Sequence, residues 1–402
     1  MHSDIGSYGD ACIAALKADG TMDFDFGPQH LGTTKLSSLG LDSAVAHAAT
    51  LTSDGRIVML LQVNLFDHYV VLLSADGTQI AHQKQFTLDT SAGGQTWHAS
   101  VLAVQHDGKI LIAGDVVPWF HSFPQPSHIV VVRMTADLSD YDHGFGNDGR
   151  ASVDFDSNAD ATNDNTNFQA MVLQSDGRIL VAGALYDYGL AALASFDAGG
   201  NLDLSFGDNN SGRITSDFGV GMSAAKALQV DAKGRIIVGG ETTTYAGNGY
   251  GSEMVINRLL ANGAQDSDFG TFDPLDPAGP VVFGADRGGS NDDILHALVV
   301  QSDGKIVAVG SGKPADAGAG LDFEVMRLNG LDGQPDFDFG VEASSMGDLG
   351  CTTASADDTA WGVVMGSGIV IAGLCESTST PEAHYGIARL KVDEIFPSSF
   401  DR

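Results

Sequence analysis

One short sequence motif, called here the hairpin phrase, occurs six times along this chain, and it constrains the fold more than any other feature. In the first five copies an apolar run is followed by a turn containing Gly, a basic residue and a second apolar run. An internal period of roughly 55 to 70 residues predicts one supersecondary unit per repeat, packed against its neighbours. The copies are LTSDGRIVMLL from residue 51, VQHDGKILIAG from 104, LQSDGRILVAG from 173, VDAKGRIIVGG from 230, VQSDGKIVAVG from 300 and the decayed MGSGIVIAG from 365.

Each copy is expected to form a β-hairpin. Two apolar runs joined by Asp-Gly are a strong hairpin signal, because both central positions of a type I′ turn need positive φ. After a loop of variable length comes a third run, and four of these runs carry Arg in their second half. The third runs are 69–73, 129–134, 190–196, 254–260, 324–328 and 386–390, with Arg133, Arg258, Arg327 and Arg389.

A turn motif of the form apolar-Asp-x-x-Phe-Gly follows most of the third runs. It reads MDFDFG from residue 22, LDLSFG from 202, QDSDFG from 265, PDFDFG from 335 and, more loosely, YDHGFG from 141. We expect the Phe to pack between neighbouring repeats, the Gly to allow a tight bend, and the Asp to pair with the recurrent Arg. A fourth short run, such as 212–218 or 280–283, completes the repeat.

Four antiparallel strands per repeat predict an all-β fold, a single β-propeller domain over 1–402 with six four-stranded blades in 41–402. Residues 1–40 supply a third-type run at 12–16, the motif and a fourth-type run at 33–39, whereas the last repeat ends in a worn motif, IFPSSFD from 395. The N-terminal strand is therefore expected to join the last blade and close the ring, which removes an exposed edge. The surplus run at 12–16 leaves seven blades as the alternative.

The hairpin, the ARL third run and the LDxxFG turn resemble the bacterial delta-60 repeat proteins, a family of predicted β-propellers. The resemblance extends from about Cys12 to Phe400 and is most faithful in the third and fifth repeats. It departs in the first repeat, where TQIAHQKQF replaces the LDxxFG turn, and in the sixth, where Asp-Gly is lost. The family implies a fold but no agreed activity.

Composition narrows the class of partner. The chain carries a formal charge of -32, with 52 acidic residues against 20 Lys and Arg, so nucleic acid and anionic membrane surfaces are not expected partners. No stretch of eighteen apolar residues occurs, so we expect no membrane insertion. The first ten residues lack a signal peptide pattern, and the acidic, Gly-rich composition is typical of an exported bacterial protein, extracellular or periplasmic. We expect a monomer.

Three cysteines are too few for a disulfide framework, and their spacing matches no zinc or redox motif. Cys351 and Cys375 are expected near the same end of the last repeat, which makes them a candidate pair. The alternative is that Cys12, Cys351 and Cys375 are three buried thiols.

The first set of candidate site residues lies in the loops after the second and fourth runs, which are long, different in every repeat and aromatic. In a propeller these loops share one face, opposite to the short Gly turns, and variable loops are common binding sites. We take Trp119, Tyr186 and Tyr245 as candidate ligand-binding residues on this face.

A second set begins the first strand of each hairpin. A small or apolar residue recurs six places before the turn Asp, and a polar residue precedes it in every repeat. If the first strand is innermost, these residues lie at the mouth of a central channel. His47, Lys226 and His296 are candidates to bind an anionic or carbonyl-bearing ligand or to act as acid and base. Ser100, Gln169 and Thr359 are candidate ligand contacts. The alternative is that these positions are polar because the channel is wet.

One loop resembles a calcium site. Asp154, Asp156, Asn158 and Asp160 have the alternating oxygen spacing of a calcium loop, but Ala159 stands in place of the central Gly. An acidic surface loop is the alternative, so calcium is a possible cofactor and we predict no other.

No HExxH, GxSxG or phosphate-binding GxxxxGK motif is present. We therefore expect an exported, non-catalytic binding module for a carbohydrate, peptide or protein. The alternative is a hydrolase or lyase in which His47, Lys226 and His296 act in the funnel, with or without a divalent cation. A third interpretation is a structural fragment of a larger surface protein.

Overall fold

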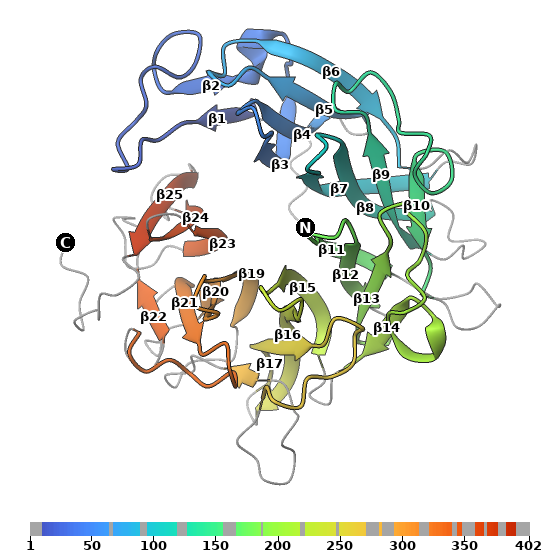
Figure 1. The fold of residues 1–402 in the computed structure, drawn as a ribbon. Helices are drawn as coiled ribbons and strands as arrows, with labels where there is room; N and C mark the ends of the chain where they lie inside the picture. The colour runs from blue at the N-terminus through green and yellow to red at the C-terminus, as the bar shows by residue number, and fades with distance from the viewer. Residues whose placement is uncertain are drawn as a thin grey trace. The chain divides into compact units, whose positions relative to one another are not determined.

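The computed structural model is built of β-strands (Figure 1). These strands belong to two compact units. The first unit comprises residues 1–179 and 196–202, and the second comprises 180–195 and 203–402. Within the described residues the helical segments are two 3₁₀ turns, η1 (Leu36–Leu39) and η2 (Asp208–Asn210). The structure describes residues 10–63, 67–88, 95–118, 127–155, 166–185, 188–217, 222–246, 249–270, 281–283, 293–312, 321–339, 344–347, 358–365, 368–376 and 383–390.

The first unit contains a two-stranded hairpin, β1-β2, and two four-stranded antiparallel sheets. Strand order in the sheets is β3-β4-β5-β6 and β7-β8-β9-β10, so neighbours in sequence are neighbours in space. Strand β11 packs against β7, β8 and β9. The bounds are β1 Cys12–Ala14, β2 Thr33–Lys35, β3 Ala44–Leu51, β4 Ile57–Val63, β5 Asp67–Leu73, β6 Ile80–Phe86, β7 Gln95–Val104, β8 Ile110–Pro118, β9 His128–Met134, β10 Arg150–Val153 and β11 Thr166–Leu173.

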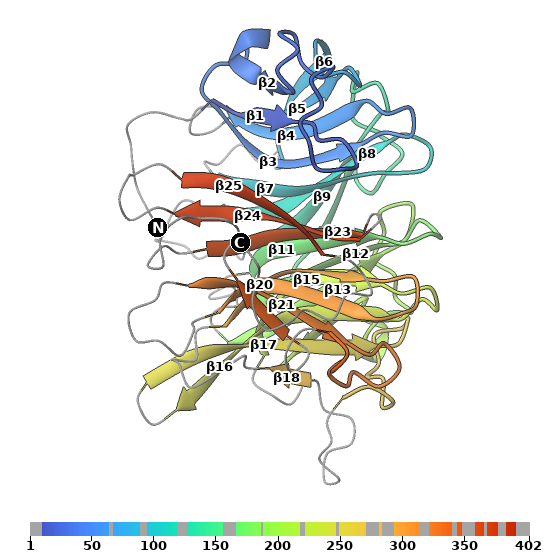
Figure 2. The ribbon, with the colours of Figure 1, turned by 90° about the vertical axis from the view of Figure 1, so that its left-hand side faces the viewer.

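The second unit repeats the same arrangement. Strands β12, β13 and β14 follow one another in a sheet, and β15-β16-β17-β18 and β19-β20-β21-β22 form four-stranded sheets. Strands β23, β24 and β25 lie side by side in a sheet of three strands within the described residues (Figure 2). The bounds are β12 Ile179–Leu185, β13 Leu190–Phe196, β14 Arg213–Ser216, β15 Met222–Val230, β16 Ile236–Ala246, β17 Gly249–Leu259, β18 Val281–Phe283, β19 Ile294–Val300, β20 Ile306–Gly312, β21 Asp322–Leu328, β22 Ser344–Gly347, β23 Asp358–Met365, β24 Ile369–Glu376 and β25 Ala383–Leu390.

The predicted hairpins are confirmed, and the second strand of each is the most buried. Strand β12, for example, is buried along its whole length. The second strand has a neighbouring strand on each side and a sheet against each face, so water reaches neither face. This is why its sequence is a continuous apolar run.

The turn type expected for the hairpins is wrong. In the first repeat Gly55 N–H donates to Thr52 O at 3.0 Å, and Thr52 N–H donates to Arg56 O at 2.9 Å. Gly55 has a φ of 83°, whereas Asp54 is not among the residues with positive φ. This geometry is a type I turn followed by a left-handed Gly in a bulge, so one glycine suffices and the preceding Asp keeps an ordinary backbone. Glycines 108, 177, 234 and 304 repeat it.

The recurrent Arg of the third strand pairs with the motif Asp, as predicted, in three repeats. The pairs join Arg Nε to Asp Oδ2: Arg133–Asp142 at 2.8 Å, Arg258–Asp266 at 2.7 Å and Arg327–Asp336 at 2.6 Å. Each guanidinium also lies over the motif Phe of its own repeat, with Phe145, Phe269 and Phe339 at 4.4, 4.5 and 4.6 Å from the guanidinium carbon to the ring centroid. We call each Arg, Asp and Phe set a clamp.

The basic residue of the hairpin turn binds the same carboxylate. Lys109 Nζ lies 3.1 Å from Asp142, Lys305 Nζ 2.8 Å from Asp336, and Arg235 Nη1 3.7 Å from Asp266. Each of these carboxylates therefore holds two cations, one from the third strand and one from the hairpin turn. This explains why a basic residue follows the Gly in the turns that carry Lys109, Arg235 and Lys305, which sequence reasoning missed.

The motif Phe packs against the next repeat, as predicted, and the motif Gly, expected only to allow a tight bend, also bonds to the next repeat. A Cβ on Gly200 would meet the Phe145 ring at 2.8 Å, and one on Gly263 would meet the Phe206 ring at 2.9 Å, so only glycine fits beneath these rings. The motif Gly then donates its N–H to the following repeat. The bonds are Gly27 to Asp76 O at 2.8 Å, Gly146 to Gly199 O at 2.7 Å, Gly207 to Asn262 O at 2.9 Å and Gly270 to Asp332 O at 3.1 Å.

The N-terminal hairpin uses the same connection. Phe26 packs on Gly77, and Thr34 Oγ1 donates to Gly77 O at 2.8 Å. In the described residues β2 pairs with β1, so closure of a ring through the last sheet, and the number of blades, stay predictions. Cys12 is a free, exposed thiol, which contradicts three buried cysteines, while Cys351 and the side chain of Cys375 lie outside the described part.

Candidate ligand-binding site

Four of the polar residues predicted at the start of the hairpins fall on breaks in the sheet register. In β3 the pairing with β4 skips His47, and in β7 the pairing with β8 skips Ser100. In the second unit the skipped residues are Lys226 in β15 and His296 in β19. A β-bulge leaves its extra residue out of the ladder and re-aims its side chain, and bulges are common beside functional sites.

In the last repeat the structure moves the position by two residues. The break in β23 falls between Ala360 and Gly362, so the bulged residue is Trp361. Thr359 pairs regularly with Leu374 instead. The decayed turn is shorter than the others, with Met365 paired to Ile369 where the fifth repeat pairs Val300 to Ile306. Counting back from the turn therefore predicted Thr359, two residues before the bulged residue Trp361.

A second position accompanies each bulge on the neighbouring strand. It lies on the second strand and pairs with the residue two places before the bulge; it follows a Gly in β8, β16, β20 and β24 and follows Leu61 in β4. Because side chains alternate along a strand, both positions face the same side of the sheet. The residues at this position include Gln62, Asp115, Glu241, Ser311 and Leu374.

In the second unit three bulges lie on strands that pack side by side, β15 with β19 and β19 with β23. Lys226 donates from Nζ to Glu241 Oε2 at 2.5 Å, and about a fifth of each side chain is exposed. The His296 ring lies 4.3 Å from the Trp361 ring between centroids, with the planes inclined at 42°. Trp361 itself is 59% exposed. We call Lys226, Glu241, His296 and Trp361 the bulge site.

Burial sets the charge of the bulge site. Removal of the His296 imidazole from water, together with the nearby positive charge of Lys226, lowers its pKa to about 4. His296 is therefore neutral at pH 7. Since Lys226 and Glu241 cancel each other, the bulge site carries no net charge there.

The first unit has a second group of rings around its bulges. His47 Nε2 lies 3.2 Å from Gln62 Oε1, and its ring stacks on His68 with centroids 6.1 Å apart. His68 is buried and lies 4.1 Å from the ring of Trp97. Next along the sheet, His98 Nδ1 lies 3.6 Å from Asp115 Oδ2.

The His98 and Asp115 pair has an electrostatic consequence. The Asp115 carboxylate raises the pKa of His98, although partial burial opposes this. Ser100 is exposed, and the amide of Gln169 in β11 donates to Asn167 Oδ1.

Several predicted site residues are not described. Trp119 and Tyr186 lie outside the described residues, and for Tyr245 in β16 only the backbone is described. Of the candidate calcium ligands, Asp154 follows β10, whereas Asp156, Asn158 and Asp160 lie outside the described part. Within that part no group of three or more His, Cys, Asp or Glu side chains is arranged to hold a metal ion. Calcium binding stays a prediction.

No helix in the described part of the chain is long and apolar enough to cross a membrane.

Comparison with known proteins supports the architecture. A family model described as a domain of unknown function, DUF5122 beta-propeller, matches residues 174–206, 234–269 and 301–339. These segments begin at or within a hairpin turn and end in the Phe-Gly motif. No curated protein matches the sequence.

Solved structures that match this chain have low sequence identity. A protein of unknown function from Dyadobacter fermentans is 13% identical, with 86% of this chain and 94% of that chain covered and a TM-score of 0.42. An α-L-arabinanase of Penicillium chrysogenum, complexed with arabinobiose, is 9% identical, with 85% and 92% covered and a TM-score of 0.43. A NanB sialidase mutant from Streptococcus pneumoniae is 9% identical, with 87% and 68% covered and a TM-score of 0.47.

The repeated four-stranded antiparallel sheets, with the family match, define an all-β protein of the β-propeller class. Its repeats are those that the hairpin and the LDxxFG turn marked in the sequence.

Proposed function

We propose that this protein is a non-catalytic carbohydrate-binding protein, and that the bulge site of the second unit holds a neutral sugar. The observation that carries the proposal is the exposed Trp361 indole beside a fixed set of polar groups. A pyranose or furanose ring offers an apolar face that stacks on an aromatic ring and hydroxyls that need hydrogen-bond partners at its edge.

The aromatic half of the site is already oriented. Trp361 is 59% exposed although it belongs to a strand, and contact with His296 restricts its ring on one side. A large aromatic side chain that is held in place contributes contact area to a complex at low conformational cost. The free face of the indole is the natural seat for the sugar ring.

The polar half supplies donors and acceptors. The ammonium of Lys226 and the carboxylate of Glu241 hold each other at 2.5 Å, and each remains partly open to solvent. Hydroxyl groups can accept from the first and donate to the second, and hydrogen bonds to charged groups are the stronger ones. With no net charge at the site and -32 on the chain, a neutral ligand is favoured over an anionic one.

The same geometry disfavours the alternative, a hydrolase or lyase. A general acid or base works best with a pKa near the working pH, and the pKa of His296 near 4 makes the imidazole a weak base. Lys226 is held in an ion pair with Glu241. Binding is therefore the better proposal for this site.

The test is calorimetric titration of the protein with a panel of neutral oligosaccharides. We expect at least one to bind with a micromolar to millimolar Kd, and Trp361→Ala to abolish the heat signal. Phe337→Ala is the matched control, because Phe337 is a 70% exposed ring in an LDxxFG turn outside the site. Binding that survives Trp361→Ala would contradict the proposal. Release of shortened sugars by the wild type, lost in His296→Gln, would favour the enzyme.

We also propose an extracellular or periplasmic location, which the acidic, cysteine-poor composition supports. Detection of the chain in the cytosolic fraction of its native cell would contradict this.

A further inference from the structure

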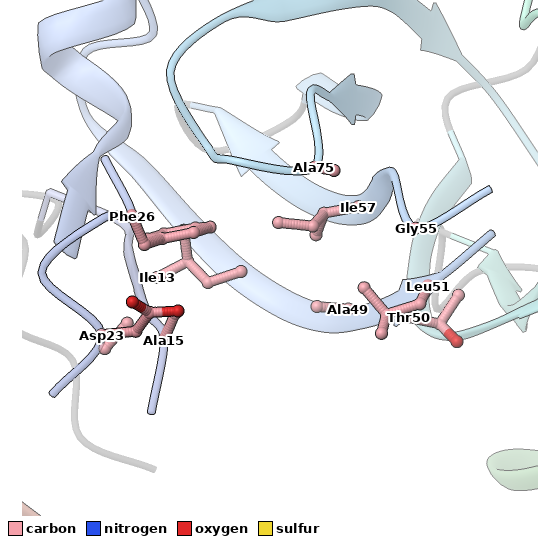
Figure 3. Close-up of a pocket in the computed structure, with 11 residues that line it drawn as sticks. Ile13, Ala15, Asp23, Phe26, Ala49, Thr50, Leu51, Gly55, Ile57 and Ala75 are labelled. Carbon is pink, nitrogen blue, oxygen red and sulfur yellow. The ribbon is translucent and has the colours of Figure 1, made fainter. Parts of the chain in front are cut away.

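The first unit contains a cavity of about 370 Å³ between the N-terminal hairpin and the end of β3 (Figure 3). Ala15, Asp23 and Phe26 of the hairpin line one side. Residues 49–51 of β3 and Ala75 from the turn after β5 line the other. Among the lining side chains only those of Thr50 and Asp23 are polar, and Asp23 carries the charge.

Comparison with the second sheet explains why the cavity exists. Asp23 N–H donates to Ala15 O, as Asp142 N–H donates to Arg133 O, so Ala15 stands where the clamp Arg stands. Arg133 Nη1 donates to Ala198 O at 2.7 Å, and Ala198 corresponds to Ala75. The cavity is therefore the room that a guanidinium fills in a complete clamp.

Asp23 consequently lacks both cations of a clamp within the described residues. Its counterpart Asp142 holds Arg133 at 2.8 Å and Lys109 at 3.1 Å. For Asp23 the described contact is a hydrogen bond from Asp25 N–H at 3.3 Å. A half-buried carboxylate that faces an apolar cavity favours a cationic side chain from outside.

The same hairpin also has an open strand edge. Strands β5 and β9 each pair on both sides, whereas β1 pairs with β2 alone in the described part of the chain. Leu36 N–H donates to Ala11 O, and Ala15 N–H donates to Gly32 O. Because backbone groups alternate between the two edges of a strand, those of Cys12 and Ala14 point away from β2.

In the complete sheets one element supplies both a cation for the motif Asp and a strand that pairs with the third strand. It is the hairpin of the repeat, whose second strand pairs along the third and whose basic residue binds the motif Asp. The basic turn residue can contact both the motif Asp and the next repeat. Arg235, the basic turn residue of its repeat, lies 3.7 Å from Asp266 and also donates to Gly330 O at 3.3 Å.

We propose that β1, β2 and the cavity form a docking site for a β-hairpin of this repeat type that lies outside residues 1–402. Its basic turn residue enters the cavity against Asp23, and its second strand pairs with β1. The described hairpins of this chain already share sheets with third strands of their own, so none is left over for β1. The hairpin phrase occurs nowhere else in the sequence.

The repeats also fix the register. Leu16 bridges Met22 as Met134 bridges Tyr141, so Leu16 corresponds to Met134 and Cys12 to Val130. Since Val130 pairs with Gly114, the docked hairpin places its Gly114 equivalent opposite Cys12. Residues directly opposite in such a pair have Cα atoms about 5.5 Å apart, a distance that a disulfide spans.

The first experiment uses a fluorescent synthetic peptide with the sequence of residues 99–117 and measures anisotropy on titration with the full chain. We expect saturable binding that weakens about tenfold with Asp23→Asn in the protein or Lys109→Ala in the peptide. Asp25→Asn is the matched control, because Asp25 is an exposed carboxylate two residues away, and it should leave the affinity unchanged. No saturable binding, or binding that Asp23→Asn leaves intact, overturns the proposal.

The second experiment traps the register in a protein carrying Cys351→Ser and Cys375→Ser. A peptide with Gly114→Cys should form a disulfide with Cys12, which is free and exposed. A peptide with Ala113→Cys places its thiol opposite Ile13 and on the other face, and it should not. Equal trapping of both peptides, or full competition by free arginine at the concentration of the peptide, would show that no strand docks.

Discussion

The imidazole of His296 packs against the indole of Trp361, with ring centroids 4.3 Å apart, at two successive breaks in sheet register. Neither residue is paired in its own ladder, so the contact depends on side chains that the bulges re-aim. Burial of the imidazole and the nearby positive charge of Lys226 make its protonation unfavourable and lower its pKa.

Stability should therefore depend on pH through His296. Its folded pKa, about 4, lies below the ordinary 6.5 because burial and Lys226 disfavour the cation. Between these values the unfolded chain binds a proton that the folded chain does not, so stability falls as pH drops from 6.5 to 4. His296 should account for a loss on the order of 3 kcal/mol in the free energy of unfolding between pH 6.5 and pH 4, and His296→Gln should abolish that loss. Urea denaturation at pH 4 to 8 checks this, with the exposed His106→Gln as a control that should behave as wild type.

Removing a clamp arginine should be strongly destabilising. Arg258 is fully buried and bonds Asp266 and the carbonyls of Gly330 and Leu331. Arg258→Ala leaves the Asp266 carboxylate buried with Arg235 alone and should lower the free energy of unfolding by about 3 to 5 kcal/mol. The exposed pair Arg56 and Asp54 offers a contrast, since Arg56→Ala should change it by less than about 1 kcal/mol. Similar losses in the two variants would refute a structural role for the clamp.

The clamp carboxylates should also set the acid limit of the fold. Burial raises the pKa of Asp336, but Lys305 and Arg327 outweigh it, so the folded pKa lies below the ordinary 3.8. The stabilisation is complete above 3.8 and is lost as pH falls through the folded value. Asp336→Asn should destabilise the protein at pH 7 and flatten the decline below pH 4. Thermal unfolding at pH 2 to 7 measures both, and the exposed Asp338→Asn should alter neither.

Two turn glycines separate backbone strain from packing. Gly20 and Gly200 occupy the same turn in their hairpins, with φ of 86° and 85°, but only Gly200 lies beneath a ring, that of Phe145. Each change to Ala incurs about 1 to 2 kcal/mol of left-handed strain. Gly200→Ala should lose a further 1 to 3 kcal/mol, roughly, through overlap with Phe145. Equal losses by denaturant titration would mean that the ring moves aside freely.

The sequence predicted the scaffold because its signals are local. The hairpin turns, the Arg133 and Asp142 pairing and the packing of Phe145 on the next repeat all follow from residue types at fixed spacing. The role of Lys109 was missed because its partner lies more than thirty residues away across a variable loop. The turn type was misjudged because Asp-Gly suits both a type I′ turn and a type I turn with a bulged Gly.

The candidate site was predicted in part. His47, Ser100, Lys226 and His296 were found because they keep a constant distance from a well-formed turn. Trp361 was missed because the last turn has lost its Asp-Gly. Its apolar neighbours gave no mark of a bulge, and Trp361 reads as an ordinary strand residue. Glu241 was also missed, since its closeness to Lys226 depends on the register between two strands.

The clamp arginines donate hydrogen bonds to main-chain oxygens of the next repeat, those of Ala198, Gly330 and Leu331. Every residue has a main-chain carbonyl whatever its side chain, so these hydrogen bonds do not depend on the side chains of the repeat that follows. Insertion, loss or exchange of whole repeats is thus compatible with the interface, and selection can alter the bulged residues one repeat at a time. Such a chain can change what it recognises without redesigning how it holds together.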